Sequence, residues 1–155
     1  MKLRAPPRIK VLEALGAIAD GRIEVVSPKE AIVTGSDGKR TYRVRWDAAS
    51  NTVSSTDPAT RFRGYVGYPV IAFLMLQGVL PYDASLASKL AGVKWRELNE
   101  KFKDYDRVME EVLKGWYWSD RKKLFRFVRW IIEMLSELNI EKGEKEARLS
   151  DFVQV

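Results

Sequence analysis

Basic and aromatic side chains alternate in the first part of the chain, a combination that can bind phosphate groups and unpaired bases. Arg43 and Arg45 are two residues apart among alternating apolar residues, so in a strand they lie on the same face. Guanidinium groups bind phosphates bidentately, and a nearby exposed aromatic ring can stack on a base. The candidate nucleic-acid-binding residues on the strands and the following linker are Lys39, Arg40, Arg43, Arg45, Arg61, Phe62, Arg63 and Tyr65.

The positive charge of the chain is concentrated in this part. Among 155 residues there are 27 Lys or Arg and 21 Asp or Glu, a net charge of +6. Residues 1–65 contain twelve basic and seven acidic residues. This balance favours an anionic partner, and we expect nucleic acid, held mainly by its phosphates. The alternative is a solvated sheet face, with Phe62 or Tyr65 in the core.

A second basic patch is expected on the last helix, where only Asp120 opposes five cations between residues 119 and 130. Cations in a first helical turn oppose the helix dipole, so helix stability does not explain them. They either bind phosphate or an acidic partner, or pair with glutamates between residues 97 and 111 of the preceding helix. The patch consists of Arg121, Lys122, Lys123, Arg126 and Arg129.

Three consecutive aromatic residues, Trp116, Tyr117 and Trp118, stand between two expected helices. We expect them to plug the helix junction. If they are exposed instead, they form a surface suited to a protein partner or a homodimer, because Trp and Tyr are enriched at interfaces. The alternative function is therefore an adaptor subunit that uses this junction and the last helix.

The chain contains no Cys and no His, which excludes thiol nucleophiles, Ser-His-Asp triads, disulfides and the usual structural zinc sites. Asp104 and Asp106 resemble an acidic pair, but in a helix their side chains point about 200° apart and cannot share an ion. We expect no metal, no cofactor and no catalytic residues. An enzyme that uses carboxylates, or Tyr and Lys, is a third possibility without a recognisable arrangement.

The cellular location is predicted from two stretches of the sequence. The first seven residues show no apolar run typical of a secretory signal. Residues 64–82 carry no charge, but glycines and prolines interrupt them, which favours a buried core helix over a membrane span. We therefore expect a cytoplasmic protein that does not contact membranes.

The pattern of apolar residues predicts an α+β fold, with an N-terminal helix and a small antiparallel β-meander followed by a C-terminal helical bundle. A helix is expected at residues 8–20, about four short strands to residue 55 with Asp37-Gly38 in a hairpin, and a linker at 56–67. An apolar helix, a short helix to residue 91, one amphipathic helix from 95 to 116 and a last helix follow. The expected parts are residues 1–66 with helix and meander, 67–140 with helices packed on it, and 141–155 as a charged tail.

Residues 8–76 resemble a SWIM-type zinc finger. In that family a Tyr-x-Val strand leads to Cys-x-Cys, and a Cys-x-His pair then opens an apolar helix. Here Tyr42-Arg43-Val44 is followed by Val53-Ser54-Ser55, and later by Gly67-Tyr68-Pro69 before an apolar helix. The resemblance implies a module that contacts DNA or proteins but has lost its metal, because Val53, Ser55, Gly67 and Pro69 stand at the ligand positions. The lost metal would have to be replaced by a core formed by Ile23, Val25, Tyr42, Val44, Trp46 and the apolar helix.

Overall fold

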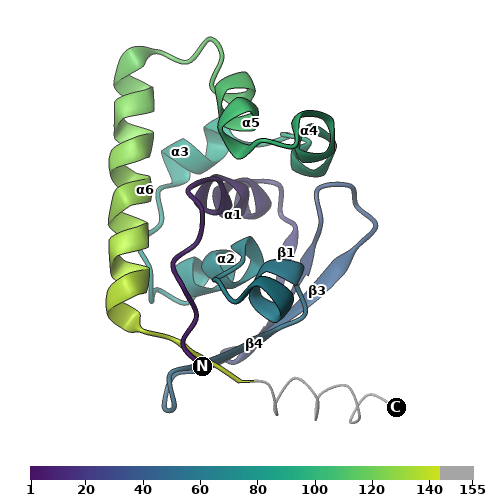
Figure 1. The fold of residues 1–155 in the computed structure, drawn as a ribbon, viewed down its shortest axis with the longest axis vertical. Coiled ribbons are helices and arrows are strands. Elements are labelled where there is room, and N and C mark those ends of the chain that lie inside the picture. Colours follow the sequence, from purple (N-terminus) through teal and green to yellow (C-terminus); the bar gives the residue numbers. More distant parts are fainter. Residues whose placement is uncertain (144–155) are drawn as a thin grey trace.

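The computed structural model describes residues 1–143 as a mixed α+β fold in which one mostly antiparallel sheet is packed against helices (Figure 1). This confirms the predicted fold class. In chain order the elements are α1 (Ile9–Ala19), β1 (Ile23–Ser27), β2 (Glu30–Thr34), β3 (Thr41–Asp47), β4 (Thr52–Ser55), η1 (Ala59–Arg63), α2 (Tyr68–Leu76), α3 (Ala84–Lys89), α4 (Trp95–Phe102), α5 (Tyr105–Val112), α6 (Trp118–Leu138) and β5 (Glu141–Lys142).

The five strands follow one another across the sheet in sequence order. The first four form an antiparallel meander, as predicted, and β5 adds a parallel edge next to β4. The connection between β2 and β3 is the expected Asp-Gly turn, in which Gly38 has a φ of +73°. The register pairs Glu30 with Arg45 and Ile32 with Arg43 across β2 and β3.

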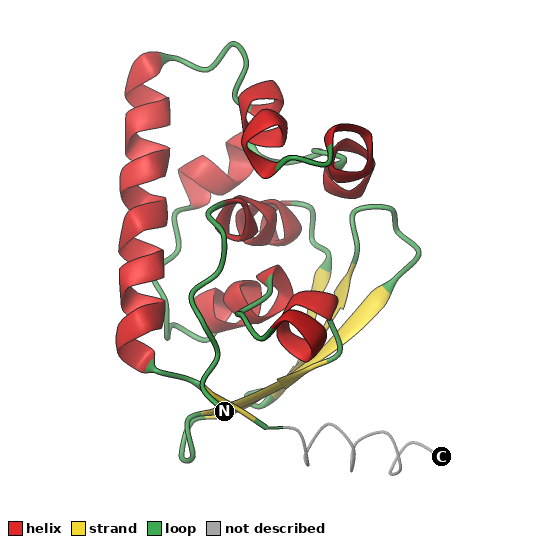
Figure 2. Cartoon of the chain, in the orientation of Figure 1, coloured by secondary structure: helices red, strands yellow, loops and turns green. Residues whose placement is uncertain are grey.

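The helices gather on one face of the sheet, with α2 next to the strands, α1 packed on α2, and α6 along the outside (Figure 2). Alternation along the strands buries Val44 and Trp46 against the helices and leaves Arg43 and Arg45 on the opposite face. One core cluster contains residues of both the meander and the helices. Val25, which we expected in this core, is exposed because β1 is an edge strand.

The prediction of a single amphipathic helix from residue 95 to residue 116 is wrong, because the helix is interrupted between α4 and α5. Lys103 has a φ of +52° and ends α4. The Asp104 carboxylate then accepts hydrogen bonds from the backbone N–H groups of Asp106 and Arg107, which caps α5. Apolar residues continue at helical spacing on both sides of the break, so periodicity alone did not reveal it.

The beginning of the expected charged tail belongs to the sheet. Glu141 and Lys142 form β5, and the Glu141 carboxylate lies 2.7 Å from the N-terminal amine and 3.2 Å from Lys2 Nζ. The rest of that predicted tail, residues 144–155, lies outside the described residues. None of the helices within residues 1–143 is long and apolar enough to cross a membrane. The cytoplasmic location stays a prediction.

Candidate nucleic-acid interface

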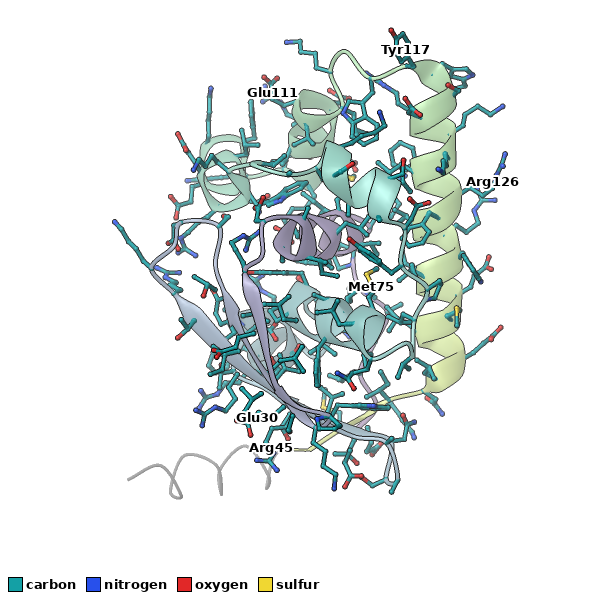
Figure 3. The ribbon with its side chains drawn as sticks, turned by 180° about the vertical axis from the view of Figure 1, so that it is seen from behind. Glu30, Arg45, Met75, Glu111, Tyr117 and Arg126 are labelled. Carbon is teal, nitrogen blue, oxygen red and sulfur yellow. The ribbon has the colours of Figure 1, made fainter. Side chains whose placement is uncertain are left out.

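The two strand arginines share one face, as the alternation predicts, but a carboxylate lies between them. Glu30 on β2 is 3.2 Å from Arg43 Nε and 3.5 Å from Arg45 Nη1. Figure 3 shows Glu30 beside Arg45 on the outer side of the sheet. Since one carboxylate offsets part of the charge of two guanidinium groups, this face attracts phosphate less than the sequence suggests.

Lys39 and Arg40 lie in the exposed hairpin between β2 and β3. Their backbone N–H groups donate to the Asp37 carboxylate, at 2.9 Å from Lys39 and 3.4 Å from Arg40. These bonds, that of Lys39 above all, hold the pKa of Asp37 below its usual value, with help from the charges of Arg96 and Arg40. The hairpin therefore presents its two cations next to a stably ionised carboxylate.

The linker between β4 and α2 forms η1, a single wide helical turn that carries Arg61, Phe62 and Arg63 at its surface. Gly64, with a φ of +74°, ends the turn. Phe62 is 76% exposed, and the Arg61 guanidinium lies 5.4 Å from the centre of its ring. An aromatic ring of this exposure next to a cation is available to a ligand.

Cations from both ends of the described chain surround η1. Arg4 forms a parallel bridge with Tyr65, and its guanidinium donates to the carbonyl oxygen of Arg63. Lys142 Nζ donates to the carbonyl oxygen of Arg61 at 2.8 Å. We call the resulting surface the η1 patch. It consists of Arg4, Arg61, Phe62, Arg63 and Lys142.

Arg4 and Lys142 are members of this surface that the sequence patterns did not predict. They are 138 positions apart, and both reach η1 because β5 pairs with β4 beside the N-terminal segment. The only local signal was the pair of basic residues at the start of the chain. Nothing in the local sequence shows that residues 1–4 and 139–142 lie side by side.

Tyr65 and Phe62 are both predicted nucleic-acid-binding aromatic residues, but they differ in exposure. The Tyr65 side chain is half-buried, and burial raises its pKa above the usual value. The Arg63 guanidinium hydrogen-bonds to the Tyr65 hydroxyl, which raises the pKa of Arg63 further. Tyr65 therefore orients Arg63, while Phe62 alone offers an open ring face.

The second basic patch on α6 divides into two parts. Arg121 Nη2 donates to the carbonyl oxygen of Leu113 at 2.6 Å, and Lys123 Nζ lies 3.6 Å from Asp83. Lys122, Arg126 and Arg129 lie on the exposed face of the helix, and Figure 3 shows Arg126 pointing away from the body of the protein. Within residues 1–143, none of these three pairs with the glutamates considered as an alternative.

The aromatic junction is only partly a plug. Trp116 is half-buried, with Lys89 Nζ 5.8 Å from the centre of its ring. At the start of α6, Tyr117 is 78% exposed and Trp118 is 73% exposed. Figure 3 shows Tyr117 at this end of the helix. The expectation of a filled junction is therefore wrong for these two residues, which face solvent.

The positions that correspond to zinc ligands in SWIM-type fingers are built differently here. Val53 and Pro69 are buried apolar residues. The Ser55 hydroxyl donates to the Asp57 carboxylate, which also accepts from the Thr60 N–H at 3.0 Å. The Gly67 N–H donates to the Thr60 hydroxyl oxygen at 3.0 Å. This Asp57 network connects the end of β4 to the start of α2, and the resemblance itself stays a prediction.

The fold and its surface define a small α+β protein with a basic, partly aromatic patch where the N-terminal segment and β5 lie beside η1. A family model with the description "Uncharacterised conserved protein UCP014422" matches residues 3–141, and the chain belongs to this family. The match covers all the helices and the four strands of the meander. No curated protein and no solved structure matched the chain.

Proposed function

We propose that the protein is a non-enzymatic module that binds single-stranded nucleic acid through the η1 patch. The observation that supports this most is the 76% exposure of Phe62 directly beside Arg61. A phenylalanine gains nothing for folding from this position, because burial is what makes an apolar ring stabilising. Stacking on an unpaired base would bury the ring, and the neighbouring cations would hold the phosphates on either side.

The charges around Phe62 favour a polyanion. Within residues 1–143, Arg4, Arg61 and Arg63 form no ion pair with a carboxylate, in contrast to Arg43 and Arg45. The sheet arginines and the hairpin residues Lys39 and Arg40 then extend the binding surface as weaker phosphate contacts. Because phosphate contacts do not distinguish bases, we expect little sequence preference. Because stacking on the ring of Phe62 needs an unpaired base, we expect a preference for single strands over duplex.

The test is fluorescence anisotropy with labelled oligonucleotides of DNA and RNA, single- and double-stranded, at two salt concentrations. We expect Phe62→Ala to weaken single-strand binding by about 1–3 kcal/mol, or about five- to 150-fold in Kd. Arg61→Gln removes one phosphate contact, so the slope of log K against log salt should fall by about 0.7 for single strands. Both side chains are exposed, and both variants should keep the wild-type Tm.

Two matched controls make the test specific. Tyr117→Ala removes an aromatic ring as exposed as Phe62, and Arg126→Gln removes the same charge from α6. Neither should change strand binding. If Arg126→Gln lowers the salt slope and Arg61→Gln does not, the site is on α6, and if wild type binds no strand at low salt the proposal is wrong.

The exposure of Tyr117 and Trp118 favours a second candidate function, an adaptor that binds a protein partner or a second copy of the chain. Large aromatic side chains dominate the binding energy of protein interfaces. Lys122, Arg126 and Arg129 continue from this end along α6, so the surface fits an acidic partner. Sedimentation at increasing concentration tests the homodimer, and Trp118→Ser should reduce any association observed. A monomer at every concentration that gives no complex with acidic proteins would exclude this function.

A further inference from the structure

A cavity of about 600 Å³ opens between α1, the β2–β3 hairpin and the segment that joins α4 to α5. Binding sites for small molecules usually have volumes of about 300–1,000 Å³. The cavity is separate from the exposed ring of Phe62, which does not contribute to its wall. Arg63 and Arg40 line it, although the sequence predicts both as surface contacts with nucleic acid.

Polar groups with unused hydrogen-bonding capacity lie in the wall of this cavity. Glu13 is only 4% exposed, with Lys10 Nζ 2.9 Å from one carboxylate oxygen and Asn99 Nδ2 donating to the other at 3.0 Å. The bond to Glu13 uses the amide nitrogen of Asn99 and leaves its Oδ1 available as an acceptor. This buried oxygen has no donor within residues 1–143. The buried Nη2 of Arg22 likewise has no acceptor there. Buried polar atoms nearly always have a partner, so a ligand or water is expected at both.

The carboxylates that line the cavity are already occupied by protein groups. Glu13 binds Lys10, Asp37 and Glu100 bind Arg96, and Asp57 and Asp104 accept hydrogen bonds from backbone N–H groups. Three cations of the lining, Arg40, Arg63 and Lys103, form no ion pair with a carboxylate of residues 1–143. Six cations and five carboxylates line the cavity, a net charge of +1. Because Arg40, Arg63 and Lys103 are the cations without a carboxylate partner, an anionic group of the ligand should lie next to them.

Aromatic side chains supply much of the remaining wall. Tyr42 and Tyr68 are in edge-to-face contact, with ring centres 6.4 Å apart, and Trp95 and Tyr105 line the cavity from α4 and α5. Such a lining favours a planar ring system over a flexible aliphatic chain. A planar ring with polar edges and an anionic group would match the wall: the ring would contact the aromatic side chains, its polar edges the unpaired atoms of Asn99 and Arg22, and the anionic group the unpaired cations.

We propose that this cavity binds a nucleotide. The base lies among the tyrosines and Trp95, with its polar edge toward Arg22 and Asn99, and the phosphate lies toward Arg40, Arg63 and Lys103. The inference goes beyond the proposed function and does not depend on it, because Phe62 and Arg61 of the η1 patch do not line the cavity, although Arg63 belongs to both. The nucleotide is either free or the end of a strand, since both present the same groups.

Calorimetry and ¹⁵N–¹H NMR test the proposal with AMP and UMP, and with adenosine and inorganic phosphate as partial ligands. We expect at least one nucleotide to bind at least tenfold more tightly than adenosine or phosphate, and to shift the indole N–H resonance of Trp95. Trp95→Phe assigns that resonance, and those of the exposed Trp118 and Trp130 should not move. Arg40→Gln should weaken nucleotide binding about tenfold, as expected for one charge-assisted hydrogen bond, while Arg126→Gln leaves it unchanged.

The outcomes separate this site from the η1 patch. Phe62→Ala should leave nucleotide binding intact, so failure of strand binding does not decide the question. If oligonucleotides but not AMP or UMP shift Trp95, and Arg40→Gln weakens that effect, the nucleotide enters as a strand end. If neither nucleotides nor oligonucleotides move Trp95, or if Arg40→Gln and Arg126→Gln have equal effects, the cavity is not a nucleotide site.

Discussion

Gly67 lies against a buried carboxylate, and replacing it with alanine tests the Asp57 network directly. A Cβ at residue 67 would lie 2.0 Å from Asp57 Oδ2 and 2.7 Å from its Cγ, far inside the usual contact of about 3.5–4.0 Å. Gly67 has a φ of −80°, which any residue adopts, so the backbone is no obstacle, and the three atoms nearest to the new Cβ all belong to this carboxylate group. Asp57 must therefore move if alanine is to fit.

Moving Asp57 breaks its bonds with the Ser55 hydroxyl and the Thr60 N–H in a place where Asp57 is only 3% exposed. Each hydrogen bond to a charged group is worth about 1.5–3 kcal/mol, so Gly67→Ala should destabilise the protein by about 3–5 kcal/mol. For a chain of this size the Tm should fall by about 10 °C. Urea unfolding followed by circular dichroism measures the difference.

The decisive variant combines Gly67→Ala with Asp57→Ala. Asp57→Ala alone leaves buried donors unpaired and should cost about 2–5 kcal/mol. In that background the Asp57 carboxylate no longer blocks the new Cβ. Gly67→Ala should then stabilise the protein by about 0.4–1 kcal/mol, because alanine lowers the conformational entropy of the unfolded chain. Gly21→Ala, with open space around the new Cβ, is the control and should have the same effect in both backgrounds. Additive effects of the two substitutions would refute the network as described.

Three further predictions concern single contacts. Burial raises the pKa of Tyr68 from 10.0 to about 12. The contribution of the protonated Tyr68 to the free energy of unfolding should therefore be fully present below pH 10 and should fall by about 1.4 kcal/mol per pH unit between about pH 10 and 12. Tyr68→Phe should flatten that fall when unfolding is measured as a function of pH. Asp104→Ala removes the cap of α5 and should cost about 1 kcal/mol by thermal unfolding. Glu30→Gln removes the negative charge that lies between Arg43 and Arg45, so single-strand binding should tighten and its dependence on salt should steepen; unchanged binding would show that the sheet face takes no part.

Local patterns in the sequence were sufficient for the elements that depend on neighbouring residues. The alternation around Val44 and Trp46 predicted which face of β3 is buried, and it placed Arg43 and Arg45 together on the other face. The Asp-Gly turn predicted the hairpin because its backbone needs a positive φ at Gly38. Each of these signals is carried by residues within a few positions of one another.

The errors arise where the outcome depends on backbone bonds or on distant segments. The break at Lys103 and Asp104 replaces one helix by two without disturbing the apolar spacing, so only the capping potential of Asp104 could have indicated it. Glu30 meets Arg45 only through the register of β2 and β3. Whether an aromatic residue such as Phe62 or Tyr117 is exposed depends on which segments cover it, and the sequence contains no local signal for that.

The Asp57 network also bears on how a chain without Cys and His can hold β4 against α2. Zinc ligands at residues 53, 55, 67 and 69 would join these elements by four bonds to one ion, and none of those side chains can supply such a bond. Here Ser55, Asp57 and Thr60 join the same two elements by hydrogen bonds. A hydrogen-bonded carboxylate needs close approach of the facing backbone, which explains why residue 67 has no side chain. The two solutions therefore exclude each other at this residue: a zinc ligand needs a side chain at residue 67, and the space it would occupy is filled by Asp57.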